Sequence, residues 1–129
     1  MYPKTIDSST LSSAITSTTS AELQVLTTPG IVAPLSVQRF SVRGWFQLTI
    51  PTSCTSVTIK LYRGSAIGGS AIWTSGAITV TAGNIISLPF SYIETDVSPD
   101  TQFYTVSVTF TAASVNGTVS FATLEAATY

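Results

Sequence analysis

Histidine is absent from this 129-residue chain, and cysteine occurs once, as Cys54. The lack of histidine excludes the commonest general base, the usual serine and cysteine triads, and most zinc and iron sites. A single cysteine cannot form an intramolecular disulfide, so the chain is not a disulfide-stabilised secreted domain. Cys54 has no histidine to activate it as a nucleophile, and we expect it to fill space. The sequence therefore predicts no catalytic residue, no metal and no cofactor.

Charge is also scarce, at 9% of the residues with a formal net charge of −1. The five basic residues form no run, so the electrostatic footprint of a nucleic-acid-binding protein is missing. No segment approaches the ~18 consecutive apolar residues of a transmembrane helix. We therefore expect neither nucleic acid nor a membrane as a partner.

The scarcity of charge conflicts with the high apolar content. Hydrophobic residues make up 44% of the chain, whereas soluble monomers usually carry about a quarter charged residues. Two interpretations stay open: other subunits cover part of the surface, or serine and threonine hydroxyls keep a monomer soluble. We favour coverage by other subunits.

The first 20 residues differ from the rest of the chain. The run from Ser8 to Ser20 is rich in serine and threonine and shows no period that would bury one face. We therefore predict an extended N-terminal arm over residues 1–20 and a sandwich domain over residues 21–129. The arm is either a solvated tail or a segment that docks on a neighbouring protein.

From residue 21 onward, apolar and polar residues alternate with a period of two, which is typical of half-buried strands. β-Branched and aromatic residues dominate these runs, and no 3.6-residue period extends for three turns. Seven or eight short strands predict an all-β fold, a two-sheet antiparallel β-sandwich of the jelly-roll kind. The residues expected to face inward are Val57, Ile59, Leu61, Ile86, Leu88, Phe90, Tyr104, Val106, Val108 and Phe110.

Two local features predict irregularities. Asn116 and Gly117 both tolerate the positive φ of a type I′ turn, so we predict a hairpin joining a strand at 102–113 to one at 118–127. Gly44 interrupts the apolar alternation after Val42, which we interpret as a β-bulge.

Three of the six acidic residues, Glu94, Asp96 and Asp100, cluster in one stretch. Their oxygens could bind calcium or form the paired carboxylates of a glycosidase. Because the spacing matches neither motif, we interpret the stretch as a solvated loop and keep both alternatives open.

Four aromatic residues lie opposite to, or outside, the inward-facing sets: Trp45, Tyr62, Trp73 and Phe103. Exposed aromatic side chains bury protein interfaces or bind sugars. We take these four as candidate interface residues, with core residues of a bulged strand and a sugar platform as the alternatives.

Several short motifs carry a family resemblance over about residues 40–129. They are TSVTIKLYRG (55–64), a Gly/Ser loop, VTAGN (80–84), SLPF (87–90) and YTVSVT (104–109). The chain resembles small β-sandwich proteins of tailed bacteriophages. These are often capsid decoration (cement) proteins or head-fibre and tail components, and many resemble trimeric jelly rolls of the tumour necrosis factor or C1q type.

The resemblance implies a non-enzymatic structural protein that stabilises a phage capsid by contacts with the major capsid protein. It further implies a homotrimer on the virion surface, assembled in the host cytoplasm. The alternative function is a tail or fibre module that recognises a host glycan.

Overall fold

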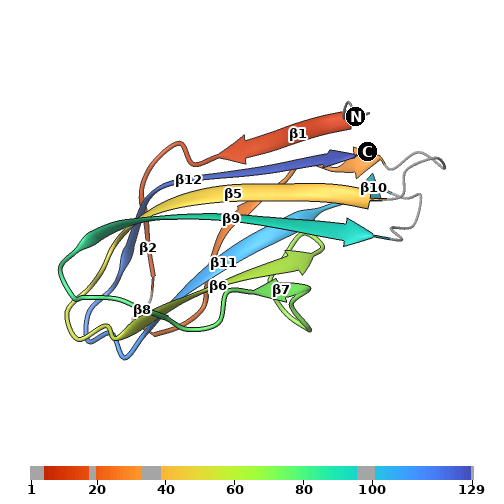
Figure 1. Ribbon diagram of the computed structural model, residues 1–129. Coiled ribbons are helices and arrows are strands. Elements are labelled where there is room, and N and C mark those ends of the chain that lie inside the picture. Colours follow the sequence, from red (N-terminus) through yellow and green to blue (C-terminus); the bar gives the residue numbers. More distant parts are fainter. Residues whose placement is uncertain (1–4, 18–19, 33–38, 96–100, 129) are drawn as a thin grey trace.

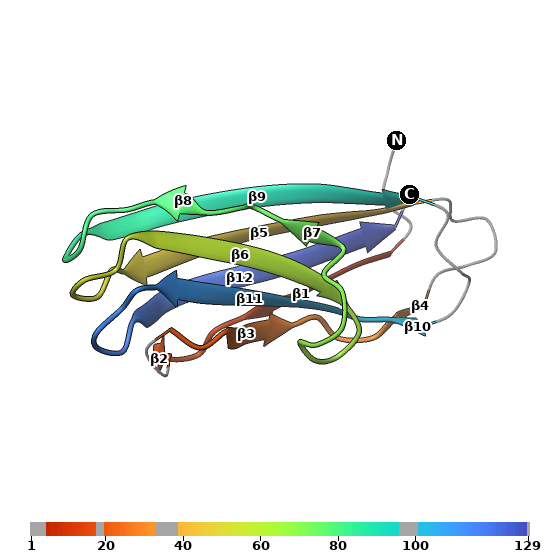
Figure 2. The ribbon, with the colours of Figure 1, turned by 90° about the horizontal axis from the view of Figure 1, so that it is seen from below.

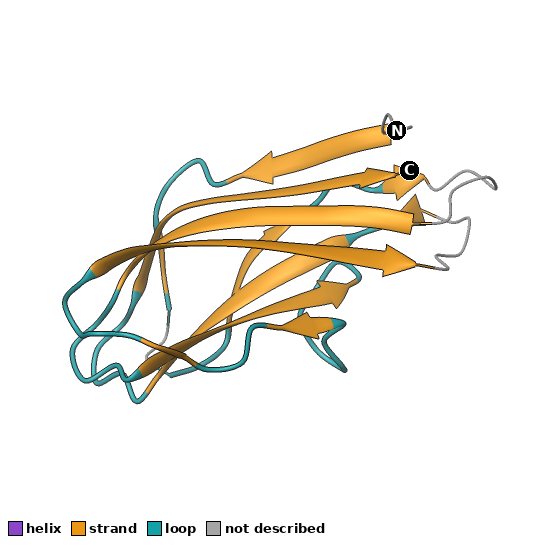
Figure 3. Cartoon of the chain, in the orientation of Figure 1, coloured by secondary structure: helices purple, strands orange, loops and turns teal. Residues whose placement is uncertain are grey.

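The computed structural model describes residues 5–17, 20–32, 39–95 and 101–128, and its regular elements there are all β-strands (Figure 3). This confirms the predicted all-β fold. No helix in the described part of the chain is long and apolar enough to cross a membrane. The strands are β1 (Thr5–Thr10), β2 (Ile15–Thr16), β3 (Leu23–Thr27), β4 (Ile31–Val32), β5 (Arg39–Thr49), β6 (Ser56–Arg63), β7 (Trp73–Thr74), β8 (Ile78–Thr79), β9 (Ile85–Thr95), β10 (Thr101–Gln102), β11 (Tyr104–Thr111) and β12 (Thr118–Thr128).

The strands form two antiparallel sheets that face each other (Figures 1 and 2). Sheet A has the order β1-β12-β5-β9, and β2 also pairs with β12. Sheet B has the order β3-β11-β6-β7, and β8 also pairs with β6. A short pair, β4 with β10, lies outside both sheets.

The strand order is that of a jelly roll. When β7 and β8 are counted as one interrupted strand, and the short β2, β4 and β10 are set aside, eight main strands remain. In chain order they occupy positions 1-8-3-6 in sheet A and 2-7-4-5 in sheet B. This double Greek-key arrangement is the jelly roll, so the predicted sandwich class is confirmed.

The segment expected to be an arm contributes two strands to sheet A. β1 pairs with β12 over six residues, from Thr5 opposite Thr128 to Thr10 opposite Thr123, and β2 pairs with Thr118 and Val119. This differs from the expectation of an arm outside a 21–129 domain. The physical reason is that backbone hydrogen bonds do not depend on side-chain polarity, so a serine- and threonine-rich segment can pair at a sheet edge.

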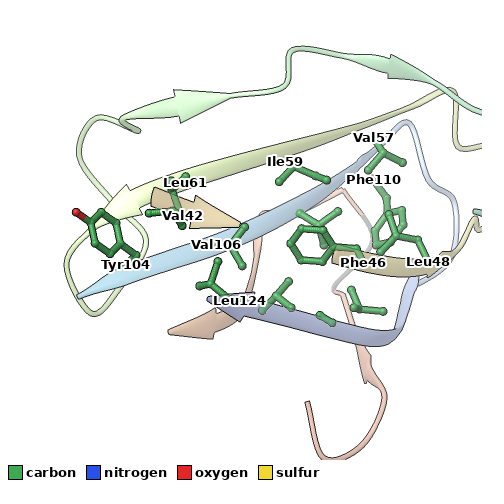
Figure 4. Packing of buried hydrophobic residues seen from close by; sticks show 14 of the residues in the cluster. Val42, Phe46, Leu48, Val57, Ile59, Leu61, Tyr104, Val106, Phe110 and Leu124 are labelled. Atoms are coloured by element: carbon green, nitrogen blue, oxygen red, sulfur yellow. The ribbon is translucent and has the colours of Figure 1, made fainter. Parts of the chain in front are cut away.

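The core lies between the sheets and draws side chains from both (Figure 4). Seven of the ten residues expected to face inward are 0–1% exposed, all of them on β6 and β11. The other three, Ile86, Leu88 and Phe90, lie on the edge strand β9, where they are half-buried against the same core. Each fully buried side chain of this size contributes roughly 1.5–3 kcal/mol to stability.

The predicted hairpin at Asn116-Gly117 is wrong. β11 belongs to sheet B and β12 to sheet A, so the connection crosses from one sheet to the other. Gly117 is not in the left-handed region; a Cβ there would lie 2.5 Å from Cδ2 of Phe110. Glycine is therefore required by the close approach of the Phe110 ring and not by a type I′ turn.

The predicted bulge at Gly44 is also wrong. β5 pairs with β9 in continuous register from Arg39 opposite Thr95 to Thr49 opposite Ile85. Gly44 faces inward beneath its cross-strand partner Phe90, whose Cε1 atom would lie 2.1 Å from an added Cβ. The register shift occurs instead in β12, between Val119 and Phe121.

Candidate functional site

A shallow hollow lies on the outer face of sheet A. It has a volume of about 240 Å³ and is lined by Arg43, Gly44 and Trp45 of β5 and by Thr123 and Glu125 of β12. The period-two alternation puts Arg43 and Trp45 on the same face of β5. The strand register places Glu125 opposite Arg43 and Thr123 opposite Trp45. The site is thus built from two cross-strand pairs on neighbouring strands.

The bulge in β12 supplies the second aromatic ring near this hollow. Val119 faces the core opposite Leu48, but one extra residue, Ser120, shifts the phase so that Phe121 faces outward opposite Gln47. The Phe121 ring lies 5.3 Å from the Trp45 ring, centroid to centroid, at an angle of 56°. This tilted geometry is favourable for aromatic pairs and holds the indole in place.

Arg43 and Glu125 form an ion pair beside Trp45. The distance from Nη2 of Arg43 to Oε1 of Glu125 is 2.5 Å, and the side chains are 59% and 33% exposed. An exposed pair of this kind contributes about 0–1 kcal/mol to stability because water screens both charges. The pair therefore adds little to the stability of the fold.

The four aromatic residues singled out from the sequence do not gather at one site. Trp45 is half-buried at the hollow, and Phe103 is 36% exposed between β10 and β11. Trp73 pairs with the inward-facing Leu61 and stacks on Phe90, with ring centroids 5.2 Å apart. Tyr62 is 4% exposed and donates a hydrogen bond to Oε2 of Glu22 at 2.7 Å, so it is buried within the chain.

The acidic stretch does not form a site in the described residues. Glu94 is buried, accepts a 2.6 Å hydrogen bond from the Tyr104 hydroxyl and pairs with Arg63. Burial and this hydrogen bond raise the pKa of Tyr104, and the hydrogen bond to Glu94 raises that of Arg63. Asp96 and Asp100 lie outside the described residues. Glu94 is therefore engaged by its own chain instead of lying in a solvated loop.

Cys54 is 4% exposed, and its Sγ atom lies 3.2 Å from the Ser56 carbonyl oxygen. Burial raises the pKa of its thiol, which keeps the sulfur in the unreactive protonated form. Within the described ranges, no group of three Cys, Asp or Glu side chains is placed to hold a metal ion.

Sequence reasoning found Trp45 but missed Arg43, Thr123 and Glu125. Their common face follows from the β5–β12 register, which the sequence does not encode locally. One signal in the sequence marks the bulge. The apolar residue Val119 is odd-numbered, whereas the apolar residues that follow it, Ala122, Leu124 and Ala126, are even-numbered, so the apolar alternation changes phase between them.

No protein-family model and no curated protein matches the sequence. Solved structures of infectious bursal disease virus do match the fold. The Gx strain structure gives a TM-score of 0.61 at 13% identity, covering 97% of this chain and 33% of that chain. The VP2 subviral particle gives 0.58 at 14% identity, with the same coverage. The T13 viral particle gives 0.56 at 14% identity, covering 96% of this chain and 31% of that chain.

The chain thus spans about a third of the length of the viral chains that it matches. At these identities the likeness concerns the fold alone, a β-sandwich of the viral capsid jelly-roll type. The finer resemblances, to phage decoration proteins and to trimers of the tumour necrosis factor or C1q type, stay predictions.

Proposed function

We propose that this chain is a structural protein of a viral particle, and that it decorates and stabilises a phage capsid by contacts with the major capsid protein. The supporting observation is the jelly-roll strand order of this chain, together with the likeness of its fold to chains of infectious bursal disease virus. Such a protein works by shape and contact area, so it needs no catalytic group.

The exposed apolar side chains support assembly with other subunits. Among the described residues the large exposed ones are Ile85 (65%), Ile93 (56%), Val115 (49%) and Phe103 (36%). Ile85 begins β9 and Ile93 lies near its other end, and β9 is one of the two edge strands of sheet A. We propose a homotrimer on the virion surface in which this edge is covered. Tyr62, being buried in its own chain, is not part of that contact.

The decisive experiment is binding of the purified chain to expanded phage capsids that lack it. We expect saturable attachment and a higher temperature for DNA release, measured with a DNA-binding dye. Absence of attachment to both full and emptied capsids would contradict the decoration role.

Light scattering tests the trimer separately. The chain should have three times its monomer mass, and an Ile85→Ser/Ile93→Ser variant should dissociate while remaining folded by circular dichroism. Ser87→Thr, a change on the same face of β9, is the matched control. A monomer mass for the unmodified chain would exclude the trimer.

A further inference from the structure

The Trp45 side chain lines the hollow on the outer face of sheet A, and its indole ring offers apolar faces on which a ligand can stack. It is half-buried, and the tilted Phe121 ring on the neighbouring strand limits its orientation. A ring that is already held in place loses little conformational freedom when a ligand stacks on it. Aromatic rings of this kind combine a large contact area with a low entropic cost of binding.

The Arg43–Glu125 ion pair borders the same hollow. Arg43 lies two residues before Trp45 on β5, and Glu125 lies two residues after Thr123 on β12. A guanidinium only donates hydrogen bonds and a carboxylate only accepts them. A sugar hydroxyl does both, so two adjacent hydroxyls can bond to the two groups at once. The exposed fractions of 59% and 33% leave both groups within reach of a ligand.

The volume of the hollow and the charges that border it limit the class of ligand that it can bind. The volume of about 240 Å³ is below the roughly 300–1,000 Å³ of pockets that enclose a drug-sized molecule, and it suits a single ring. The charge of Arg43 is balanced by Glu125, so the hollow offers no net positive charge to a phosphate or carboxylate. A recess bordered by a charged pair also fits a small polar ligand better than it fits the flat surface of another protein.

We propose that this hollow binds one neutral pyranose sugar. The apolar face of the sugar ring rests on the Trp45 indole, and two neighbouring hydroxyls bond to Arg43 and Glu125. A capsid decoration protein and a tail module could each carry such a site. The inference therefore does not rest on attachment to a capsid.

Saturation-transfer-difference NMR on the full chain tests the site. The probes are the methyl glycosides of glucose, galactose, mannose and N-acetylglucosamine, with N-acetylneuraminic acid as the anionic comparison. We expect transfer to the ring C–H protons of at least one neutral sugar and none to the acid. No transfer to any neutral sugar, or stronger transfer to the acid, would overturn the proposal.

Substitutions locate the binding. Trp45→Leu should weaken the affinity about tenfold, a loss equivalent to roughly 1.4 kcal/mol, and Glu125→Gln should weaken it as well. Trp73→Phe is the matched control, because Trp73 stacks on Phe90 away from the hollow. Circular dichroism and the thermal midpoint establish that each variant is folded. Unchanged affinity in a folded Trp45→Leu variant would overturn the assignment.

Fluorescence gives a second readout, because the chain has only two tryptophans. In Trp73→Phe, sugar should change the emission of the remaining Trp45, whereas Trp45→Phe should show no sugar-dependent change. If the chain instead self-associates through this face, Trp45→Leu will lower its mass in light scattering. That result, together with no saturation transfer, would assign the hollow to a protein contact.

Discussion

The outer faces of the two sheets differ in how far their outward-facing side chains are exposed to solvent. On sheet B, the outward-facing Tyr62, Thr105 and Ser107 are 4%, 0% and 0% exposed. On sheet A, the outward-facing Trp45 is half-buried and Arg43 is exposed. These residues lie on β6 and β11 in sheet B and on β5 in sheet A, and all three strands are central in their sheets. Position within the sheet therefore does not explain the difference.

The difference arises because other segments of the chain cover the outer face of sheet B and bond to its hydroxyl groups. On sheet B, Glu22 accepts hydrogen bonds from Tyr62 and Ser107, and the Thr105 hydroxyl donates to the Gly64 carbonyl oxygen at 2.7 Å. Among the described residues, no buried side-chain nitrogen or oxygen lacks a partner. The outer face of sheet B therefore contributes to stability, whereas that of sheet A stays open to a ligand.

Substitutions in the core between the two sheets should lower the free energy of unfolding the most. Phe110→Ala removes a ring that is 0% exposed, and we expect a loss of about 3–5 kcal/mol in the free energy of unfolding. Phe121→Ala, on the open face of sheet A, should cost less because the ring is only half-buried. Urea denaturation measures both values. Equal losses would mean that Phe121 packs as tightly as the core.

The two glutamates provide the direct comparison between the faces. Glu22→Ala leaves the buried hydroxyls of Tyr62 and Ser107 without their common acceptor, at a cost of about 1–3 kcal/mol for each unsatisfied group. Glu125→Ala breaks only an exposed ion pair, so its effect should be at most about 1 kcal/mol. A larger loss for Glu125→Ala in thermal or urea denaturation would reverse the contrast.

Gly44 connects the open face of sheet A to the core, because its backbone lines the hollow while Phe90 covers its inner side. Gly44→Ala should destabilise the fold by about 1–3 kcal/mol, since the added methyl group meets the Phe90 ring. In a double-mutant cycle, the loss should be smaller when Phe90→Leu is also present. Strict additivity would show that the two residues do not interact.

The closed face of sheet B should also make stability depend on alkaline pH. Burial and the hydrogen bond to Glu22 raise the pKa of Tyr62 from 10.0 to about 12. The folded chain therefore holds this proton more tightly than the unfolded chain. The resulting stabilisation is complete below pH 10 and is lost as the pH rises through about 12.

Urea denaturation between pH 9 and pH 12, roughly the range over which tyrosine titrates, measures this effect. Tyr62→Phe should flatten the decline, while the buried Tyr104, whose pKa is also raised, remains in both proteins. The same slope in the variant and the unmodified chain would exclude Tyr62 as a source of the pH dependence.

Local sequence patterns predicted the strands well. Val57, Ile59 and Leu61 alternate with polar residues, and the structure buries all three, because successive side chains of a strand point to opposite faces. The same reasoning did not find β1: an edge strand rich in serine and threonine has little apolar surface to reveal its pairing.

The sequence by itself determined the all-β class, the inward set on β6 and β11, and the absence of histidine chemistry, because each depends only on residue type and a period of two. Tertiary structure decided the rest. The chain crosses between sheets after β11 instead of forming a hairpin, and the bulge at Ser120 turns Phe121 outward beside Trp45. Cross-strand register, which depends on pairing between distant segments, then places Glu125 opposite Arg43 and creates the hollow.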